Sequence, residues 1–245
     1  MIALPDGFAF SLAGGAVAMA LGAMAALPFA VRLRPMARRL SIVWAPVAGM
    51  VLFAFGVFAV QAPLQRAIAA WIEGAVSPFW LGAHVWLLPA ALALVASLVQ
   101  EMARLGAVWF ASARVRAPDA AVGALVGAGV GLFEAAMVLG AVPPQQLHIL
   151  SVAVLERVGA VAFHTGAGAA LGVGIGRGRA VSALSAVVAL HWAIDGLAAM
   201  YGVGLVPLAL AEAMSLAIGM GVWLWALGSA AGTGQQVAPR GAGRP

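Results

Sequence analysis

Long apolar stretches separated by short polar segments run along most of the chain. A helix needs about 20 apolar residues to cross a bilayer, and stretches of that length occur at about 8–31, 40–61, 84–113, 119–141, 149–176, 180–201 and 205–228. The pattern predicts an all-α, polytopic membrane protein with about seven transmembrane helices. Residues 1–228 are expected to form a single transmembrane domain, and the Gly- and Pro-rich residues 229–245 a flexible tail. An amphipathic segment, 62–74, is expected to lie along the outer membrane interface.

Arginines mark alternate loops between these spans. The opposite loops hold only Arg66. The arginine-rich loops and tail contain Arg32, Arg34, Arg38, Arg39, Arg114, Arg116, Arg177, Arg179, Arg240 and Arg244. Because cytoplasmic loops carry an excess of positive residues, the pattern predicts an N-terminus outside and a C-terminus inside the cell.

The composition narrows the classes of chemistry further. With 64% hydrophobic and 9% charged residues, the chain is too apolar for a soluble domain. It has no cysteine and no lysine, which excludes disulfides, thiolate sites and a Schiff-base lysine. Its arginines sit in short loops, so the net charge of +5 does not indicate nucleic-acid binding. Abundant Ala, Gly and Arg without Lys are typical of a GC-rich bacterial genome, and we expect the bacterial cytoplasmic membrane.

Ionisable residues are concentrated in the third to sixth predicted spans. A charge at mid-bilayer costs about 2.5–3.5 kcal/mol on insertion scales, so these groups are expected to face one another in a shared interior. Their depth below the predicted outer loops places this cleft in the outer half of the membrane. They are Glu101, Arg104, Glu134, Glu156, Arg157, His164, His191 and Asp195.

Glycines at helical spacing support this arrangement. Gly123, Gly127 and Gly131 form a ridge that Glu134 continues, and His164 lies on a similar ridge with Gly168 and Gly172 on the next span. Small residues at such spacing let membrane helices pack closely. The polar groups are therefore expected on packed faces, away from lipid.

The charges in this cleft do not balance. Four acids (Glu101, Glu134, Glu156 and Asp195) face two arginines, which leaves two negative charges beside two histidines. Such a site must hold extra protons, protonate its histidines or bind a divalent cation. No organic cofactor is expected. Zinc is the metal considered, with His164, His191 and Glu101 as candidate ligands, although an H-E-x-x-H helix is absent.

Four short motifs occur in a familiar order: "QEMAR" (100–104), "GAGVGLFEA" (127–135), "LERVGAVAFH" (155–164) and "HWAID" (191–195). Together they resemble YhfC-type members of the CAAX-protease-like superfamily of intramembrane peptidases, which also includes PrsW. The resemblance covers four spans, about half of the chain. It implies a helical core in which a glutamate activates water to cleave a membrane-associated protein or peptide.

The resemblance also implies roles for individual residues. The E-x-x-R pair of the family corresponds to Glu101 and Arg104, and its later motifs correspond to His164 and to His191 with Asp195. Glu134 and the Glu156–Arg157 pair match the acidic motifs of the YhfC branch.

One position departs from the family pattern. The first motif usually reads E-E, whereas Gln100 precedes Glu101 here. If the family's base is the missing first glutamate, the protein is inactive or uses Glu156 or Glu134 instead.

The residues themselves suggest the same chemistry, with alternatives. Glu101 would take a proton from water while Arg104 orients it, and the two histidines would donate to the oxyanion. Asp195 would fix the ring of His191, and Arg157 would be a structural counter-ion to Glu134 or Glu156. The alternatives are a structural Glu101–Arg104 ion pair, a proton-coupled transporter, or a non-catalytic scaffold on a peptidase fold. Glu212 on the seventh span is expected to be interfacial or structural.

Overall fold

A computed structural model describes residues 11–33, 35–115, 120–148 and 151–233. The described residues form helices and short connections, with no strand among them. Seven helices are long and apolar enough to cross a membrane, which confirms the predicted helical class and number of spans. Arg34, Arg116, Arg240 and Arg244 lie outside the described residues. The orientation in the membrane stays a prediction from the arginine pattern.

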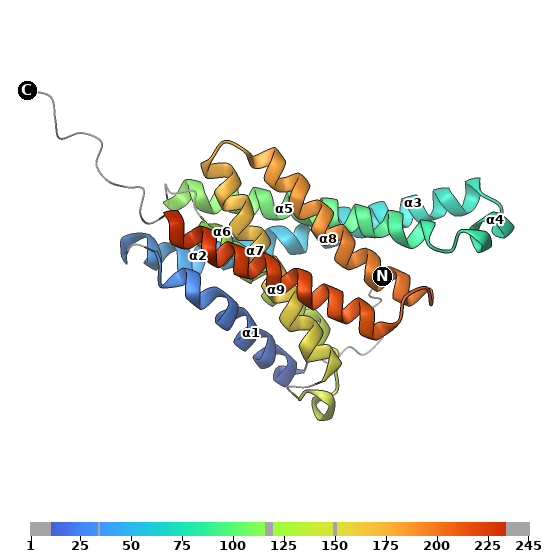
Figure 1. Cartoon of the computed structure of the whole chain (residues 1–245), viewed down its shortest axis with the longest axis horizontal. Coiled ribbons are helices and arrows are strands. Elements are labelled where there is room, and N and C mark those ends of the chain that lie inside the picture. The colour runs from blue at the N-terminus through green and yellow to red at the C-terminus, as the bar shows by residue number, and fades with distance from the viewer. Residues whose placement is uncertain (1–10, 34, 116–119, 149–150, 234–245) are drawn as a thin grey trace, which may run out of the picture.

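The helices follow one another with short connections (Figure 1). Their bounds are α1 Leu12–Ala30, α2 Pro35–Phe55, the π-helix η1 Gly56–Gln61, α3 Ala62–Ala75, α4 Pro78–Ala83, α5 Leu87–Val115, α6 Ala120–Gly140, the 3₁₀-helix η2 Pro144–Gln146, α7 Val152–Gly176, α8 Ala180–Gly202 and α9 Leu208–Thr233. The last helix thus runs past residue 228, where the flexible tail was expected to begin. Residues 234–245 of that tail lie outside the described residues.

Small polar residues and glycines set several helix ends. The hydroxyl oxygens of Ser11, Ser77 and Ser151 accept backbone N–H groups in the first turns of α1, α4 and α7, which is the usual N-cap arrangement. Gly178 and Gly204 have φ of 66° and 76° in the turns that follow α7 and α8. Glycine suits both turns because other residues rarely adopt these angles.

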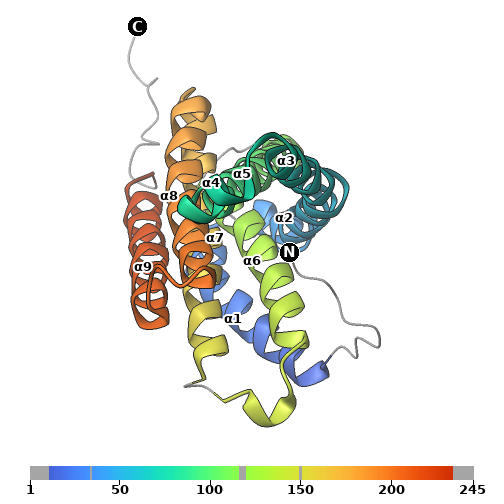
Figure 2. The same cartoon turned by 90° about the vertical axis from the view of Figure 1, so that its right-hand side faces the viewer.

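Helices α6 and α7 form the centre of the bundle (Figure 2). In their apolar windows 67% and 78% of residues are buried, against 11% in both α8 and α9. Glycine explains this close packing, since a Cβ on Gly123 would clash with the Gly168 carbonyl of α7, and one on Gly127 with the His164 carbonyl. The two glycine ridges expected from the sequence therefore face each other. This contact brings Glu134 and His164 together.

The second span and the amphipathic segment after it form one continuous helix. Helix α2 passes through the π-helical turn η1 into α3 without a break (Figure 1). The 33 residues from Val43 to Ala75 extend about 50 Å at about 1.5 Å per residue, whereas the apolar core of a bilayer is about 30 Å thick. Helix α3, which covers the segment at 62–74, is therefore a continuation of the second span.

Candidate active site

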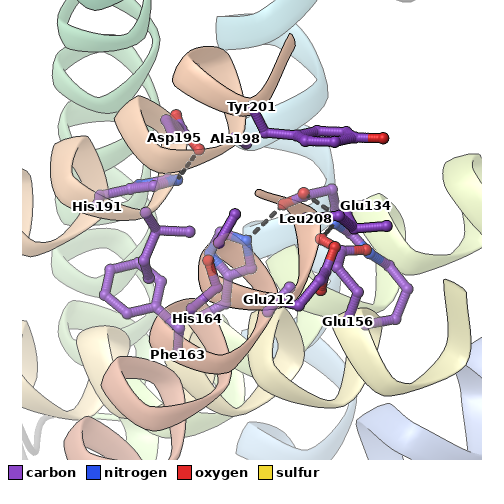
Figure 3. Close-up of a pocket in the computed structure, with 15 residues that line it drawn as sticks. Glu134, Glu156, Phe163, His164, His191, Asp195, Ala198, Tyr201, Leu208 and Glu212 are labelled. Carbon is purple, nitrogen blue, oxygen red and sulfur yellow. Dashed lines mark hydrogen bonds and ion pairs between the residues drawn. The ribbon is translucent and has the colours of Figure 1, made fainter. Parts of the chain in front are cut away.

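A cavity lies among four helices (Figure 3). It has a volume of about 180 Å³ and is lined from α6, α7, α8 and α9. Its ionisable or hydroxyl-bearing lining residues are Glu134, Glu156, Arg157, His164, His191, Asp195, Tyr201, Glu212 and Ser215. The cavity lies near the α6–α7 and α8–α9 connections, and so at the end of the bundle opposite the turn with Arg177 and Arg179.

Helix α5 lies behind this cavity and contributes a buried ion pair. Glu101 and Arg104 are both 0% exposed, and neither lines the cavity. One terminal nitrogen of Arg104, Nη1, lies 2.5 Å from each carboxylate oxygen of Glu101. The sequence predicted that Glu101 contacts the reacting water. The structure instead surrounds it with protein, so its contact with the cavity runs through another residue.

Two histidines connect this pair to the cavity. The ring of His191 uses Nδ1 to contact Glu101 Oε1 at 2.6 Å. On the other side, Arg104 Nη2 contacts His164 Nδ1. His164 Nε2 in turn lies 2.5 Å from Glu134 Oε2, at the cavity wall.

The network continues on the far side of Glu134. Arg157 Nη1 donates to Glu134 Oε1 at 2.7 Å, and the Arg157 guanidinium also donates to both oxygens of Glu156. The sequence left open which of these acids Arg157 neutralises, and the structure shows contacts to both. Together these contacts join α5, α6, α7 and α8.

Asp195 forms the other end of the network. Its Oδ2 lies 3.4 Å from the hydroxyl of Ser97 on α5, and its Oδ1 lies 3.7 Å from His191 Nε2. That separation is beyond hydrogen-bond range. Within the described residues, His191 Nε2 therefore has no hydrogen-bond partner, and His191 lines the cavity beside Asp195 (Figure 3).

Phe163 fixes the positions of the two imidazoles. Its ring centroid lies 5.0 Å from that of His191 and 5.6 Å from that of His164. Arg104 Cζ lies 5.9 Å from the same centroid, within the range of a cation–π contact. Phe53 of α2 packs edge-on against His164 at 6.1 Å. These aromatic contacts restrict rotation of both rings.

The structure adds residues that the sequence did not place in the site. Glu212 and Ser215 line the cavity from α9, and Tyr201 lines it from the end of α8. Figure 3 shows the Tyr201 ring across one side of the cavity, with its hydroxyl on the Glu134 side. Glu212 was expected to be interfacial or structural because it lies near the outer end of the seventh predicted span. The only signal in the sequence was a carboxylate inside an apolar span.

Gln100 lies outside this network. Its Nε2 donates to Gln61 Oε1 at 3.0 Å, and Gln61 in turn lies 3.4 Å from Gln65. Gln65 donates to the Leu92 carbonyl at 2.8 Å. These glutamines form a polar seam between α5 and the η1–α3 segment. Position 100 is thus on a different face of α5 from Glu101 and is not among the cavity residues.

No arrangement for a metal ion occurs in the part of the chain that the structure describes. No three His, Asp or Glu side chains there are placed to share an ion. His164 has both ring nitrogens engaged, and Nδ1 of His191 is held by Glu101. The geometry therefore gives no support to zinc as a resident ion.

Comparisons with known proteins give no assignment. The chain matches no protein-family model, no curated protein and no solved structure. Its chemistry is therefore inferred from the residues of the cavity and from their contacts.

Proposed function

We propose that the chain is an intramembrane peptidase of the bacterial cytoplasmic membrane, and that it cleaves a membrane-associated protein or peptide. One observation carries this proposal: His191, which lines a cavity between membrane helices, has Nδ1 held by a buried carboxylate and Nε2 at 3.7 Å from Asp195, beyond hydrogen-bond range. A base oriented by a third group is the usual arrangement in hydrolases. In this scheme His191 contacts the reacting water and Glu101 positions His191.

The Glu101 carboxylate determines which ring nitrogen of His191 carries the proton. Arginine is protonated and can only donate hydrogen bonds, so Arg104 keeps Glu101 ionised. An ionised carboxylate only accepts, so the proton of neutral His191 lies on Nδ1. Its Nε2, which lies 3.7 Å from Asp195 Oδ1, then carries the lone pair.

The reaction uses this lone pair twice. His191 Nε2 takes a proton from water as the water oxygen adds to the carbonyl carbon of the substrate. The C–N bond then breaks, and the proton passes from Nε2 to the leaving amine. Asp195 stabilises the imidazolium formed in between, while Arg157 and Tyr201 are the donors at the cavity wall for the oxyanion.

The resemblance to YhfC-type peptidases supports the same residues. The four motifs contribute every member of the network from Glu156 through Arg104 to Asp195, although they lie on four different helices. The departure at Gln100 does not weaken the proposal, because position 100 faces Gln61 and has no place in the scheme.

A proton-coupled transporter fits the geometry less well. A proton relay needs groups that both give and accept protons, but the network passes through Arg104 and Arg157. Guanidinium groups do not release their protons in proteins. The network is therefore interrupted twice as a path for protons. A non-catalytic scaffold would have the same geometry, and only an activity measurement separates it from a peptidase.

The test compares the N-termini of membrane proteins in cells that express the wild type, His191→Gln or His148→Gln at equal levels. His148 is exposed and outside the cavity, so His148→Gln is a matched control. We expect new N-termini with the wild type and with His148→Gln, and their loss with His191→Gln. Identical N-termini in all strains and in cells without the protein would contradict peptidase activity and favour the scaffold or transporter.

A further inference from the structure

We infer that Arg104 is a positioning residue that holds His164 and His191 in opposite tautomers. Its guanidinium is fully buried and uses two different nitrogens, with Nη1 on Glu101 and Nη2 on His164. One side chain therefore contacts one histidine directly and reaches the other through a carboxylate. For neutral imidazole rings the tautomers follow from these contacts, and only their use in hydrolysis rests on the proposed function.

The tautomer of His164 follows from the direct contact. Arg104 has no acceptor atom, so His164 Nδ1 must supply a lone pair to Nη2. The ring proton of His164 then lies on Nε2. This N–H donates to Glu134 Oε2, whose carboxylate also accepts from Arg157.

The tautomer of His191 follows from the indirect contact. Glu101 accepts from Arg104 and uses Oε1 to accept from His191 Nδ1. The proton of His191 thus lies on Nδ1, the opposite position from that in His164. The two rings lie 5.4 Å apart and are nearly perpendicular, with an interplanar angle of 77°.

Because their tautomers are opposite, the two histidines have different hydrogen-bonding roles at Nε2. His164 becomes a donor that holds the Glu134 carboxylate at the cavity wall. His191 becomes an acceptor at Nε2, which lies 3.7 Å from Asp195 Oδ1 in a residue that lines the cavity. A lysine at position 104 has a single nitrogen and cannot reproduce the planar fork that joins Glu101 to His164. The guanidinium itself is therefore required.

Nitrogen-15 NMR of histidine-labelled protein in lipid bilayers at pH 7.5 tests this inference, because protonated and bare ring nitrogens have different chemical shifts. The chain has four histidines, and His84→Gln and His148→Gln would identify the signals of the two that lie outside the network. We expect a protonated Nε2 for His164 and a protonated Nδ1 for His191. Identical tautomers for these two residues in the wild type would overturn the inference.

Two variants separate positioning from a structural role. In Arg104→Lys we expect His164 to lose its single tautomer and show signals of Nδ1 protonation. In the matched control Arg66→Lys, which changes an exposed arginine on α3, we expect wild-type signals. An unchanged His164 spectrum in folded Arg104→Lys would contradict the role of Arg104.

Folding of Arg104→Lys is judged by comparing its thermal unfolding with that of the wild type in the same detergent. If this variant does not fold, the wild-type tautomers still decide the inference. The readout needs no substrate, so failure of the peptidase proposal would leave this test unaffected.

Discussion

Individual buried charges in this protein are held by specific partners, and Glu101 is the strongest case. Both Glu101 and Arg104 are 0% exposed, so removal of one partner leaves an uncompensated charge inside the bundle. Loss of one partner of a buried ion pair typically costs about 3–5 kcal/mol. We expect Glu101→Ala to lower the free energy of unfolding by about that amount, measured by denaturant unfolding in mixed micelles.

Glu73→Ala is the control for this prediction. Glu73 lies exposed on α3, and substitutions of exposed residues usually change stability by less than about 0.5 kcal/mol. Equal losses in the two variants would mean that the Glu101–Arg104 pair does not stabilise the fold.

The position of Gln100 outside the cavity predicts that a glutamate there does not increase activity. If a missing glutamate at this position made the protein inactive, Gln100→Glu would restore or raise cleavage. We expect no gain, because position 100 faces Gln61 and the substitution removes the N–H donor of that contact. The measurement is the number of new membrane-protein N-termini that each variant produces relative to the wild type. Gln61→Glu is measured in parallel, because it changes the hydrogen-bond partner of Gln100. More cleavage in Gln100→Glu would place position 100 in the active site.

The sequence predicted which ionisable residues lie close together in the interior, but not which of them line the cavity. The cost of charge in lipid and the helical spacing were enough to bring Glu101, His164 and His191 into one interior. The rotation of α5 relative to α7 and α8 decides which acid meets the cavity. Periodicity does not encode that rotation, so Glu101 was expected at the water. Glu212 was expected at the interface from its place near the end of a span, whereas the packing of α9 brings it to the cavity.

The close contact between helices α6 and α7 positions Glu134 beside His164. The carbonyl of His164 occupies the space that a Cβ on Gly127 would need. Overpacking of this kind typically costs about 1–3 kcal/mol. We expect Gly127→Ala to lower the free energy of unfolding by about 1–3 kcal/mol and to reduce cleavage, because α7 must move away from Glu134.

Gly106→Ala is the matched control on α5. An added Cβ at this position meets no atom within 4 Å, so the variant should be as stable as the wild type or slightly more stable. Both variants can be compared by thermal unfolding in the same detergent. A Gly127→Ala variant with wild-type stability and activity would show that α6 and α7 can separate without consequence.

The sequence pattern did not reveal that α2, η1 and α3 form one continuous helix. The amphipathic residues at 62–74 were expected to lie along the outer membrane interface, apart from the second span. One helix can pass from an apolar to an amphipathic sequence without a break in its backbone. Here Pro63 lies in the first turn of α3, directly after the π-helical turn η1. The glutamine seam then attaches this extension to α5.

The orientation of the whole molecule determines which compartment supplies the substrate. The cavity lies at the end of the bundle opposite the Arg177–Arg179 turn. If that turn is cytoplasmic, as the arginine pattern predicts, the cavity lies in the outer half of the membrane. A substrate would then enter from the external side or laterally from the outer leaflet.

Cysteine labelling tests this orientation directly, since the natural chain has no cysteine. Phe79 on α4 is 88% exposed and Val181 at the start of α8 is 78% exposed, and they lie at opposite ends of the predicted topology. We expect a membrane-impermeant maleimide to label Phe79→Cys in intact cells and Val181→Cys only after permeabilisation. The reverse pattern would place the cavity toward the cytoplasm. Because the contacts of His191 do not depend on orientation, that result would change the source of the substrate and leave the proposed chemistry intact.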